Sequence, residues 1–391
     1  MAFQLNTHYP QNFFREIECR QFNQPAIKFL SQHYLLSIVF FFVLGKLLYV
    51  FTYFILLQGQ IIENNLINNV CHWDCQWYKN LISHGYDTVA YPIDDSMFSG
   101  QANWAFFPLF PLISRGLIQI FNSEFSVIVL NQILFFASMI LLYQFCASNY
   151  SKNIALIATL ILGVSSENIY ILSLYTESLF IFLSLLTLHL ITNNKYVAAA
   201  ICCGLLSATK VQGAAMSLPL LLCYARSGNF AFTKKRVLSL LVLLVLSLSG
   251  LLIYMVYLKF QTGDFLAFYN IQQQWARFHT SWLHPVKAIK SIHGNAIDTV
   301  FAILSMLPIF YFYRQKRYNE FLFLLLCWLM AVLSQNLMGI TRFLFANYAI
   351  YIFLAICSTR TKILFFCMIS AILFFNITIT YLWLIDSTYA I

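Results

Sequence analysis

Charged residues are scarce in this sequence of 391 residues. Charged side chains make up 9% of the residues and hydrophobic ones 60%, whereas soluble globular chains carry about 25% charged residues. The mean hydropathy is +0.73. A folded chain still exposes a large surface to its solvent, so a soluble fold of this size cannot hide so much apolar surface. The composition excludes a soluble globular protein and predicts an all-α polytopic membrane protein.

Signatures of nucleotide and metal chemistry are also missing. The sequence has no glycine-rich phosphate loop, no GxSxG and no nucleotide fingerprint, which argues against soluble ATP or a nucleotide sugar bound by a cytoplasmic motif. The ten cysteines form no CxxC pair and no zinc-finger spacing, so we predict no structural metal site and leave the need for a divalent metal open. Cys71 and Cys75 could pair in an oxidising exterior, although we expect a bridge within one turn to constrain little.

Long apolar runs predict the architecture. Residues 1–33 are polar and mixed, so we expect a cytoplasmic N-terminal segment followed by an uncleaved first span. Residues 34–391 are expected to form one transmembrane domain. Its predicted spans are eleven in number, at residues 34–57, 126–146, 154–172, 177–192, 197–209, 211–225, 237–258, 298–313, 321–337, 342–357 and 363–384. The stretch 197–225 could instead be one kinked element.

The basic residues indicate the orientation. Most of the 23 Lys and Arg residues fall in short segments on one side of these spans, most clearly in Lys234-Lys235-Arg236 and around Arg314 and Arg317. The positive-inside rule assigns that side to the cytoplasm. The net charge of +9 is therefore a sign of topology, and no nucleic-acid partner is expected. Most acidic residues fall on the outer side, which is where we expect chemistry to occur.

Two long outer loops are predicted, at residues 58–125 and 259–297. The first contains a helix-compatible stretch from Asp74 to His84 and an amphipathic stretch at 112–121 that suits the membrane surface. On a helix, Asp74, Trp77 and Tyr78 share one face. A carboxylate beside aromatic rings suits a general base that accepts a hydroxyl proton. The alternative is an interfacial helix with a solvated Asp74.

Three further ionisable residues lie close to predicted span ends. Glu177 fills a short outer turn, where it could simply favour the N-terminus of the following helix. Lys210 and Arg342 are cations beside the membrane on the outer side, which is costly if they are buried. An anionic partner would explain them, either a lipid-linked phosphate or an acid such as Glu177 or Glu167. Snorkelling to the interface is the alternative.

Several motifs occur in a fixed order from residue 73 to residue 343. They are Trp73-Asp74-x-x-Trp77-Tyr78, Gly85-Tyr86, Phe106-Phe107-Pro108-Leu109-Phe110-Pro111, Tyr175-Thr176-Glu177-Ser178-Leu179-Phe180, Gly263-Asp264 with Trp275 and Arg277, and Thr341-Arg342-Phe343. Together they resemble the PIG-V family of mannosyltransferases, which belongs to the GT-C membrane glycosyltransferases. The chain departs from the family pattern at His72 and Lys210, where relatives often have Arg.

The resemblance implies a reaction and a role for each residue. A polyprenyl- or dolichyl-phosphate sugar would donate its sugar to an acceptor hydroxyl with inversion, and Asp74 would be the catalytic base. Arg342 and Lys210 would bind the donor phosphate. The residues implied to contact sugar or acceptor are Trp73, Trp77, Tyr78, Tyr175, Glu177, Asp264, Trp275 and Arg277.

The predicted function is therefore a GT-C-type mannosyltransferase acting on a lipid-linked or glycan acceptor at the extracytoplasmic face. We expect a bacterial inner membrane rather than the endoplasmic reticulum, and the oligomeric state is open. One alternative is a flippase of lipid-linked sugars, which would need a polar path across the membrane; Lys46 is the main ionisable residue inside a predicted span. The other alternative is a non-catalytic subunit of a glycosylation complex.

Overall fold

The computed structural model describes residues 25–56, 70–93, 99–230 and 233–387. Most of the predicted N-terminal segment and the start of the first outer loop lie outside these residues. Within them the protein is helical, and the one β-type contact is an isolated bridge between His293 and Asn336. The predicted all-α architecture is confirmed.

The helices follow one another with short connections. In chain order they are α2 (Pro25–Gln32), α3 (Tyr34–Phe51), the π-helical turn η2 (Thr52–Leu56), α5 (Asp74–His84), the 3-10 turn η3 (Asn103–Ala105), α6 (Leu109–Phe121), α7 (Phe125–Asn149), α8 (Lys152–Gly163), α9 (Glu167–Ile171), α10 (Glu177–Thr192), α11 (Tyr196–Ser207), the 3-10 turn η4 (Val211–Met216), α12 (Ser217–Ser227), α13 (Lys234–Thr262), α14 (Ala267–Asn270), the 3-10 turn η5 (Ile271–Trp275), α15 (Pro285–Lys290), α16 (Ala296–Leu304), α17 (Met306–Arg314), α18 (Tyr318–Leu333), α19 (Ile340–Phe345), α20 (Tyr348–Ser358) and α21 (Lys362–Leu384).

Five segments of the described chain are long and apolar enough to cross a membrane: Tyr34–Phe54, Phe125–Asn149, Lys234–Thr262, Ala296–Arg314 and Lys362–Leu384. Five other predicted spans overlap shorter apolar helices, which are α8, α10, α11, α18 and α20. The predicted span 211–225 falls on η4 and α12. The structure thus has the helices of an integral membrane protein, and the count of eleven spans stays a prediction.

Three predicted spans are interrupted. The run 154–172 ends as α8 at Gly163 and resumes as α9, and the run 298–313 breaks between α16 and α17 at Ser305. The run 342–357 breaks where the Asn347 side chain accepts a hydrogen bond from the Ala349 amide and so caps α20. Polar residues that bond to the backbone favour a new helix start, whereas hydropathy alone counts them as part of a continuous run.

Small residues bring α11 and α13 together. A Cβ atom at Gly250 would lie 2.2 Å from the carbonyl oxygen of Gly204, so only glycine allows this approach of the two backbones. The helix α11 leads directly to Lys210, and α13 leads to the loop that carries Arg277. Their close packing therefore sets the spacing between two parts of the candidate site.

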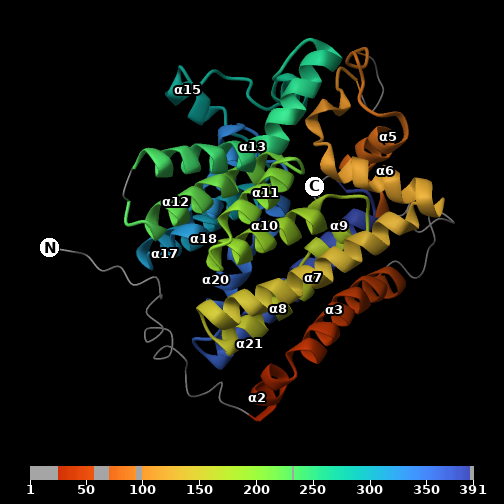
Figure 1. Ribbon diagram of the computed structural model, residues 1–391. Coiled ribbons are helices and arrows are strands. Elements are labelled where there is room, and N and C mark those ends of the chain that lie inside the picture. Colours follow the sequence, from red (N-terminus) through yellow and green to blue (C-terminus); the bar gives the residue numbers. More distant parts are fainter. Residues whose placement is uncertain (1–24, 57–69, 94–98, 231–232, 388–391) are drawn as a thin grey trace.

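Figure 1 shows α5, α6 and α15 at one end of the bundle and α2 at the opposite end. The 29-residue helix α13 is about 43 Å long at 1.5 Å per residue. It begins at the basic cluster Lys234-Lys235-Arg236 and ends at Thr262, before the loop that carries Arg277.

Candidate active site

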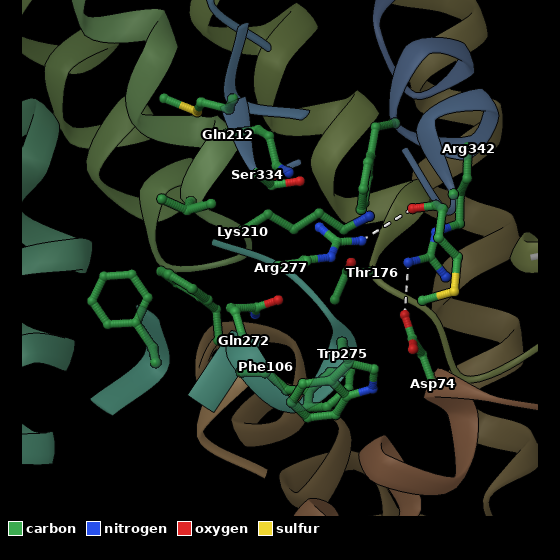
Figure 2. Close-up of a pocket in the computed structure, with 18 of the residues that line it drawn as sticks. Asp74, Phe106, Thr176, Lys210, Gln212, Gln272, Trp275, Arg277, Ser334 and Arg342 are labelled. Carbon is green, nitrogen blue, oxygen red and sulfur yellow. Dashed lines mark hydrogen bonds and ion pairs between the residues drawn. The ribbon is translucent and has the colours of Figure 1, made fainter. Parts of the chain in front are cut away.

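A cavity of about 360 Å³ lies where α5, η4, η5, α19 and the turn before α10 converge. Figure 2 shows that polar and aromatic side chains from these elements surround it. Eight of the sequence-predicted site residues line the cavity: Asp74, Tyr78, Tyr175, Glu177, Lys210, Trp275, Arg277 and Arg342. The fold thus brings together residues that are up to 268 positions apart.

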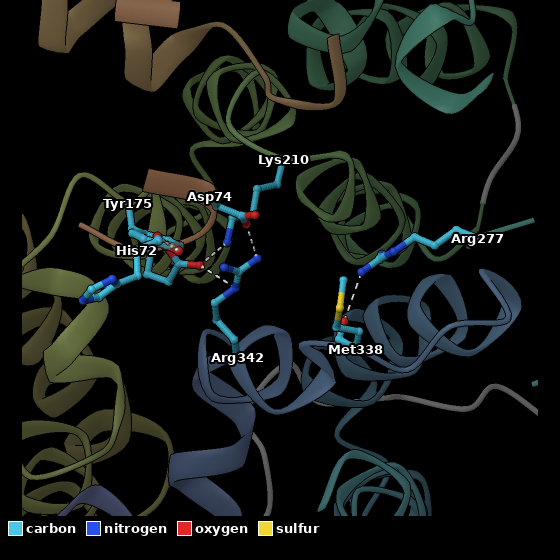
Figure 3. A network of polar contacts seen from close by, with 8 residues as sticks. His72, Asp74, Tyr175, Lys210, Arg277, Met338 and Arg342 are labelled. Atoms are coloured by element: carbon cyan, nitrogen blue, oxygen red, sulfur yellow. Dashed lines mark hydrogen bonds and ion pairs between the residues drawn. The ribbon is translucent and has the colours of Figure 1, made fainter. Parts of the chain in front are cut away.

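Two acids and two cations alternate along one wall of the cavity (Figure 3). The Arg342 guanidinium donates a hydrogen bond from Nη2 to Asp74 Oδ2 at 2.6 Å. Its Nε lies 3.4 Å from Glu177 Oε1, and the Lys210 ammonium donates a hydrogen bond to the same oxygen. The order Asp74–Arg342–Glu177–Lys210 therefore balances two negative with two positive charges.

The exposure of the side chains distinguishes the roles of the residues in this network. The side chain of Glu177 is 1% exposed and that of Arg342 is 8% exposed, whereas 28% of Asp74 is exposed. Burying a charge is tolerated when it is paired and hydrogen-bonded. Glu177 is thus a structural counter-ion for both cations, not only a favourable charge at the start of α10. Asp74 is the carboxylate that remains open to a molecule in the cavity.

Arg277 does not belong to the network of Asp74, Arg342, Glu177 and Lys210. Its Nη2 donates a hydrogen bond to the Met338 carbonyl at 3.0 Å, and its guanidinium lies 5.8 Å from the centre of the Phe343 ring. It forms no ion pair with any residue of the described ranges. Burial lowers the pKa of Arg277 to about 10, so the group is charged at neutral pH. The cavity therefore carries one positive charge that no bonded carboxylate balances.

Aromatic rings form the opposite wall. Phe106 and Trp275 line the cavity with ring centres 6.3 Å apart. Trp77 is 3% exposed and stacks behind Phe106, with ring centres 5.8 Å apart. Trp77 therefore supports the aromatic wall without lining the cavity.

Two other predicted residues lie away from the lining. Asp264 accepts hydrogen bonds from the Leu266 amide and from the Asn270 side chain, so its carboxylate closes a local turn after α13. Trp73 precedes α5, and its buried Nε1 has no hydrogen-bond partner in the described part of the chain. The structure places neither residue in contact with the cavity.

Some cavity residues were not singled out from the sequence. Gln212 lies in an apolar stretch, and Ser334 follows α18. Gln272 belongs to the run Gln272-Gln273-Gln274, which on its own does not predict a chemical role. Single uncharged polar residues of this kind carry no spacing rule, so only the fold identifies them as possible hydroxyl contacts.

Lys46 and Glu167 lie deeper in the bundle. Lys46 donates a hydrogen bond to Asn168 at 2.8 Å and lies over the Phe42 and Phe135 rings. Both carboxylate oxygens of Glu167 are buried without a hydrogen-bond partner in the described residues. Among those residues, no three His, Cys, Asp or Glu side chains come together as a metal site.

In comparisons with known proteins, no family model matches the chain and no curated protein is significantly similar to it. The likeness to the PIG-V family therefore depends on the ordered motifs alone. The residues of those motifs that meet in the cavity are Asp74, Tyr78, Phe106, Phe107, Tyr175, Thr176, Glu177, Trp275, Arg277, Arg342 and Phe343.

Proposed function

We propose that the protein is an inverting membrane glycosyltransferase of the GT-C type, most closely like the PIG-V mannosyltransferases. Its donor would be a polyprenyl- or dolichyl-phosphate sugar, and its acceptor a hydroxyl of a lipid-linked sugar or glycan. One observation carries the proposal: a partly exposed carboxylate, Asp74, shares a cavity with three cations and an aromatic wall.

The proposed reaction uses Asp74 as the base. The acceptor oxygen forms a bond to the anomeric carbon while the bond from that carbon to the phosphate oxygen breaks. The leaving lipid phosphate keeps the bonding electron pair, and the acceptor proton moves to Asp74. Aromatic faces such as those of Trp275 and Phe106 suit the apolar face of a sugar ring, and the amide of Gln272 suits its hydroxyl groups.

The charges of the cavity fit this change. A lipid-phosphate sugar carries one negative charge, and the leaving phosphate gains a second. Arg277 is the cation of the cavity that forms no ion pair with a carboxylate of the described residues, so it supplies the first positive charge for the donor. When Asp74 accepts the proton it loses its negative charge, which releases part of the charge of Arg342 toward the leaving group. Lys210 remains held by Glu177.

The proposal also includes the sidedness of the site. The cavity lies at the end of α13 away from Lys234-Lys235-Arg236, and basic clusters mark the cytoplasmic side. A disulfide joins Cys71 and Cys75 next to Asp74, and disulfides persist outside the reducing cytoplasm. Both observations support a site on the extracytoplasmic face, in a bacterial inner membrane or on the lumenal side of the endoplasmic reticulum, with eleven spans.

The test compares membranes that contain wild-type protein, Asp74→Asn or Glu124→Gln. Each is incubated with labelled polyprenyl-phosphate mannose and an acceptor extract. We expect transfer by the wild type and a loss of about 10²–10⁴-fold in Asp74→Asn, the range for a general base. Glu124 pairs with Lys79 on the surface, so Glu124→Gln should transfer at the wild-type rate. Unchanged transfer by Asp74→Asn would refute the role of the base, and lipid translocation without transfer in vesicles would favour a flippase.

A further inference from the structure

The turn that carries Asp74 has a backbone conformation that its sequence does not favour. Trp73 has φ 54° and ψ −117°, and the Cys75 amide donates a hydrogen bond to the His72 carbonyl at 3.1 Å. These are the second position and the closing hydrogen bond of a type II′ turn. Glycine dominates that position because a Cβ atom crowds the backbone at positive φ. Asp74 comes next and is the first residue of α5.

A disulfide crosses this turn. It joins Cys71, before the turn, to Cys75 in the first turn of α5. Both cysteines are buried, so the bridge is shielded from reductants. It spans a tryptophan at positive φ rather than a relaxed turn of helix. A bridge within one relaxed turn is expected to constrain little, whereas this bridge spans a residue at positive φ.

The residues just before the bridge and at the start of the loop that it closes are fixed to other elements. The Val70 carbonyl accepts a hydrogen bond from the indole of Trp383 in α21 at 3.1 Å. The His72 carbonyl accepts one from the Tyr175 hydroxyl at 2.9 Å. The bridge links this anchored segment to the start of α5, where the Asp74 carboxylate lies 2.6 Å from Arg342.

We propose that the Cys71–Cys75 disulfide is a positioning device that holds the Trp73 turn and so directs Asp74 toward the cavity. The inference rests on the proposed function for its kinetic part. Without the bridge, Trp73 is free to move to negative φ, which rotates the peptide that precedes Asp74. A displacement of about 1 Å in a catalytic group costs about 10²-fold in rate. The bridge acts through Asp74 and touches no substrate.

The kinetic test uses the double variant Cys71→Ala/Cys75→Ala. We expect kcat to fall 10- to 100-fold while the donor KM changes less than twofold, because the cations and the aromatic wall are untouched. The control is Cys146→Ala, a buried free cysteine in α7, and the double variant should unfold within a few degrees of it. Retention of the wild-type kcat by the double variant overturns the proposal.

A rescue experiment separates positioning from a general loss of structure. Trp73→Gly, added to the double variant, places glycine where the backbone has positive φ. Because glycine adopts this conformation without a penalty, we expect kcat to recover at least threefold. A general packing defect would instead grow worse on loss of the indole, so a further fall in kcat counts against the proposal.

Hydrogen exchange tests the turn without reference to activity. The amides at positions 75 and 76 donate to the carbonyls of His72 and Trp73 in the intact protein. We expect both to exchange at least tenfold faster in the double variant than in Cys146→Ala. Equal exchange overturns the positioning role. A wild-type protein that transfers no sugar from any lipid-phosphate donor would refute the proposed function, while exchange would still decide the role of the bridge.

Discussion

Arg277 offers the sharpest test of how the cavity binds an anion, because it is the lining cation that forms no ion pair with a carboxylate of the described residues. The change Arg277→Gln removes this charge and keeps an amide N–H near the Met338 carbonyl, where Arg277 now donates its hydrogen bond. A hydrogen bond to a charged group contributes about 1.5–3 kcal/mol. At about 1.4 kcal/mol per factor of ten, the Kd for a lipid-phosphate sugar should rise roughly 10- to 150-fold.

The assay is binding of labelled polyprenyl-phosphate mannose to the detergent-solubilised protein, with thermal unfolding measured in parallel. Arg277→Gln should leave the unfolding temperature almost unchanged. Arg342→Gln should lower it strongly, since Asp74 and Glu177 would then share a wall without their common cation, and breaking a buried pair costs about 3–5 kcal/mol. Arg115→Gln, on the exposed face of α6, is the matched control for loss of one arginine.

The pH dependence of binding follows from the same residue. Burial lowers the pKa of Arg277 to about 10 in the folded protein, and the protonated form is the one that binds an anion. Affinity should therefore be constant from pH 7 to pH 9 and fall as the pH rises through 10. If the Kd of Arg277→Gln at neutral pH is unchanged, Arg342 and Lys210 provide the anion site. That result would refute the reasoning that their charges are already balanced by Asp74 and Glu177.

Two further predictions concern the carboxylates. Glu177→Gln keeps the shape of the side chain but leaves Lys210 and Arg342 without their shared counter-ion, so the free energy of unfolding should fall by about 3–5 kcal/mol. The control Glu124→Gln breaks the partly exposed pair with Lys79 and should lower the free energy of unfolding by less than about 1 kcal/mol. Equal losses in thermal melts would contradict the structural role of Glu177. Asp264→Asn should retain kcat/KM within twofold, since its carboxylate bonds only to the local turn in the structure. A loss above tenfold in the transfer assay would place Asp264 in the reaction after all.

Much of the helical framework could be predicted from the sequence. The expected helix from Asp74 to His84 is present as α5, and the expected span 177–192 is α10 (Glu177–Thr192). The helix α10 is a continuous apolar run that begins at a charged residue, Glu177, and α5 begins at Asp74. The breaks within the other runs were missed because side chains such as Asn347 bond to the backbone of a neighbouring turn, which is a matter of geometry and not of hydropathy.

The members of the candidate site could also be predicted, and Glu177 was one of the partners considered for Lys210 and Arg342, but the sequence could not choose among those partners. Lys210 and Arg342 were expected to bind either a lipid phosphate or a nearby acid, and the structure shows Glu177 between them. Sequence separation hides such pairs, because residues 177, 210 and 342 meet only after α10, η4 and α19 have packed together. The pairing bears on which cation binds a phosphate, because cations that have buried carboxylate partners are costly to detach from them.

In the proposed reaction, this pairing joins the base and the phosphate site in one network. A carboxylate that held its guanidinium equally well before and after proton transfer would contribute nothing to the departure of the phosphate. Asp74 bonds to Arg342 through Oδ2, and protonation weakens that bond at the moment when negative charge grows on the leaving group. Arg342 is therefore expected to matter more for kcat than for donor affinity, whereas Arg277 is expected to matter more for donor affinity. The resemblance to the PIG-V family implied a phosphate contact for Arg342 and a sugar or acceptor contact for Arg277. In the proposed reaction, Arg277 has the larger part in binding the donor phosphate, and Arg342 has the larger part in its departure.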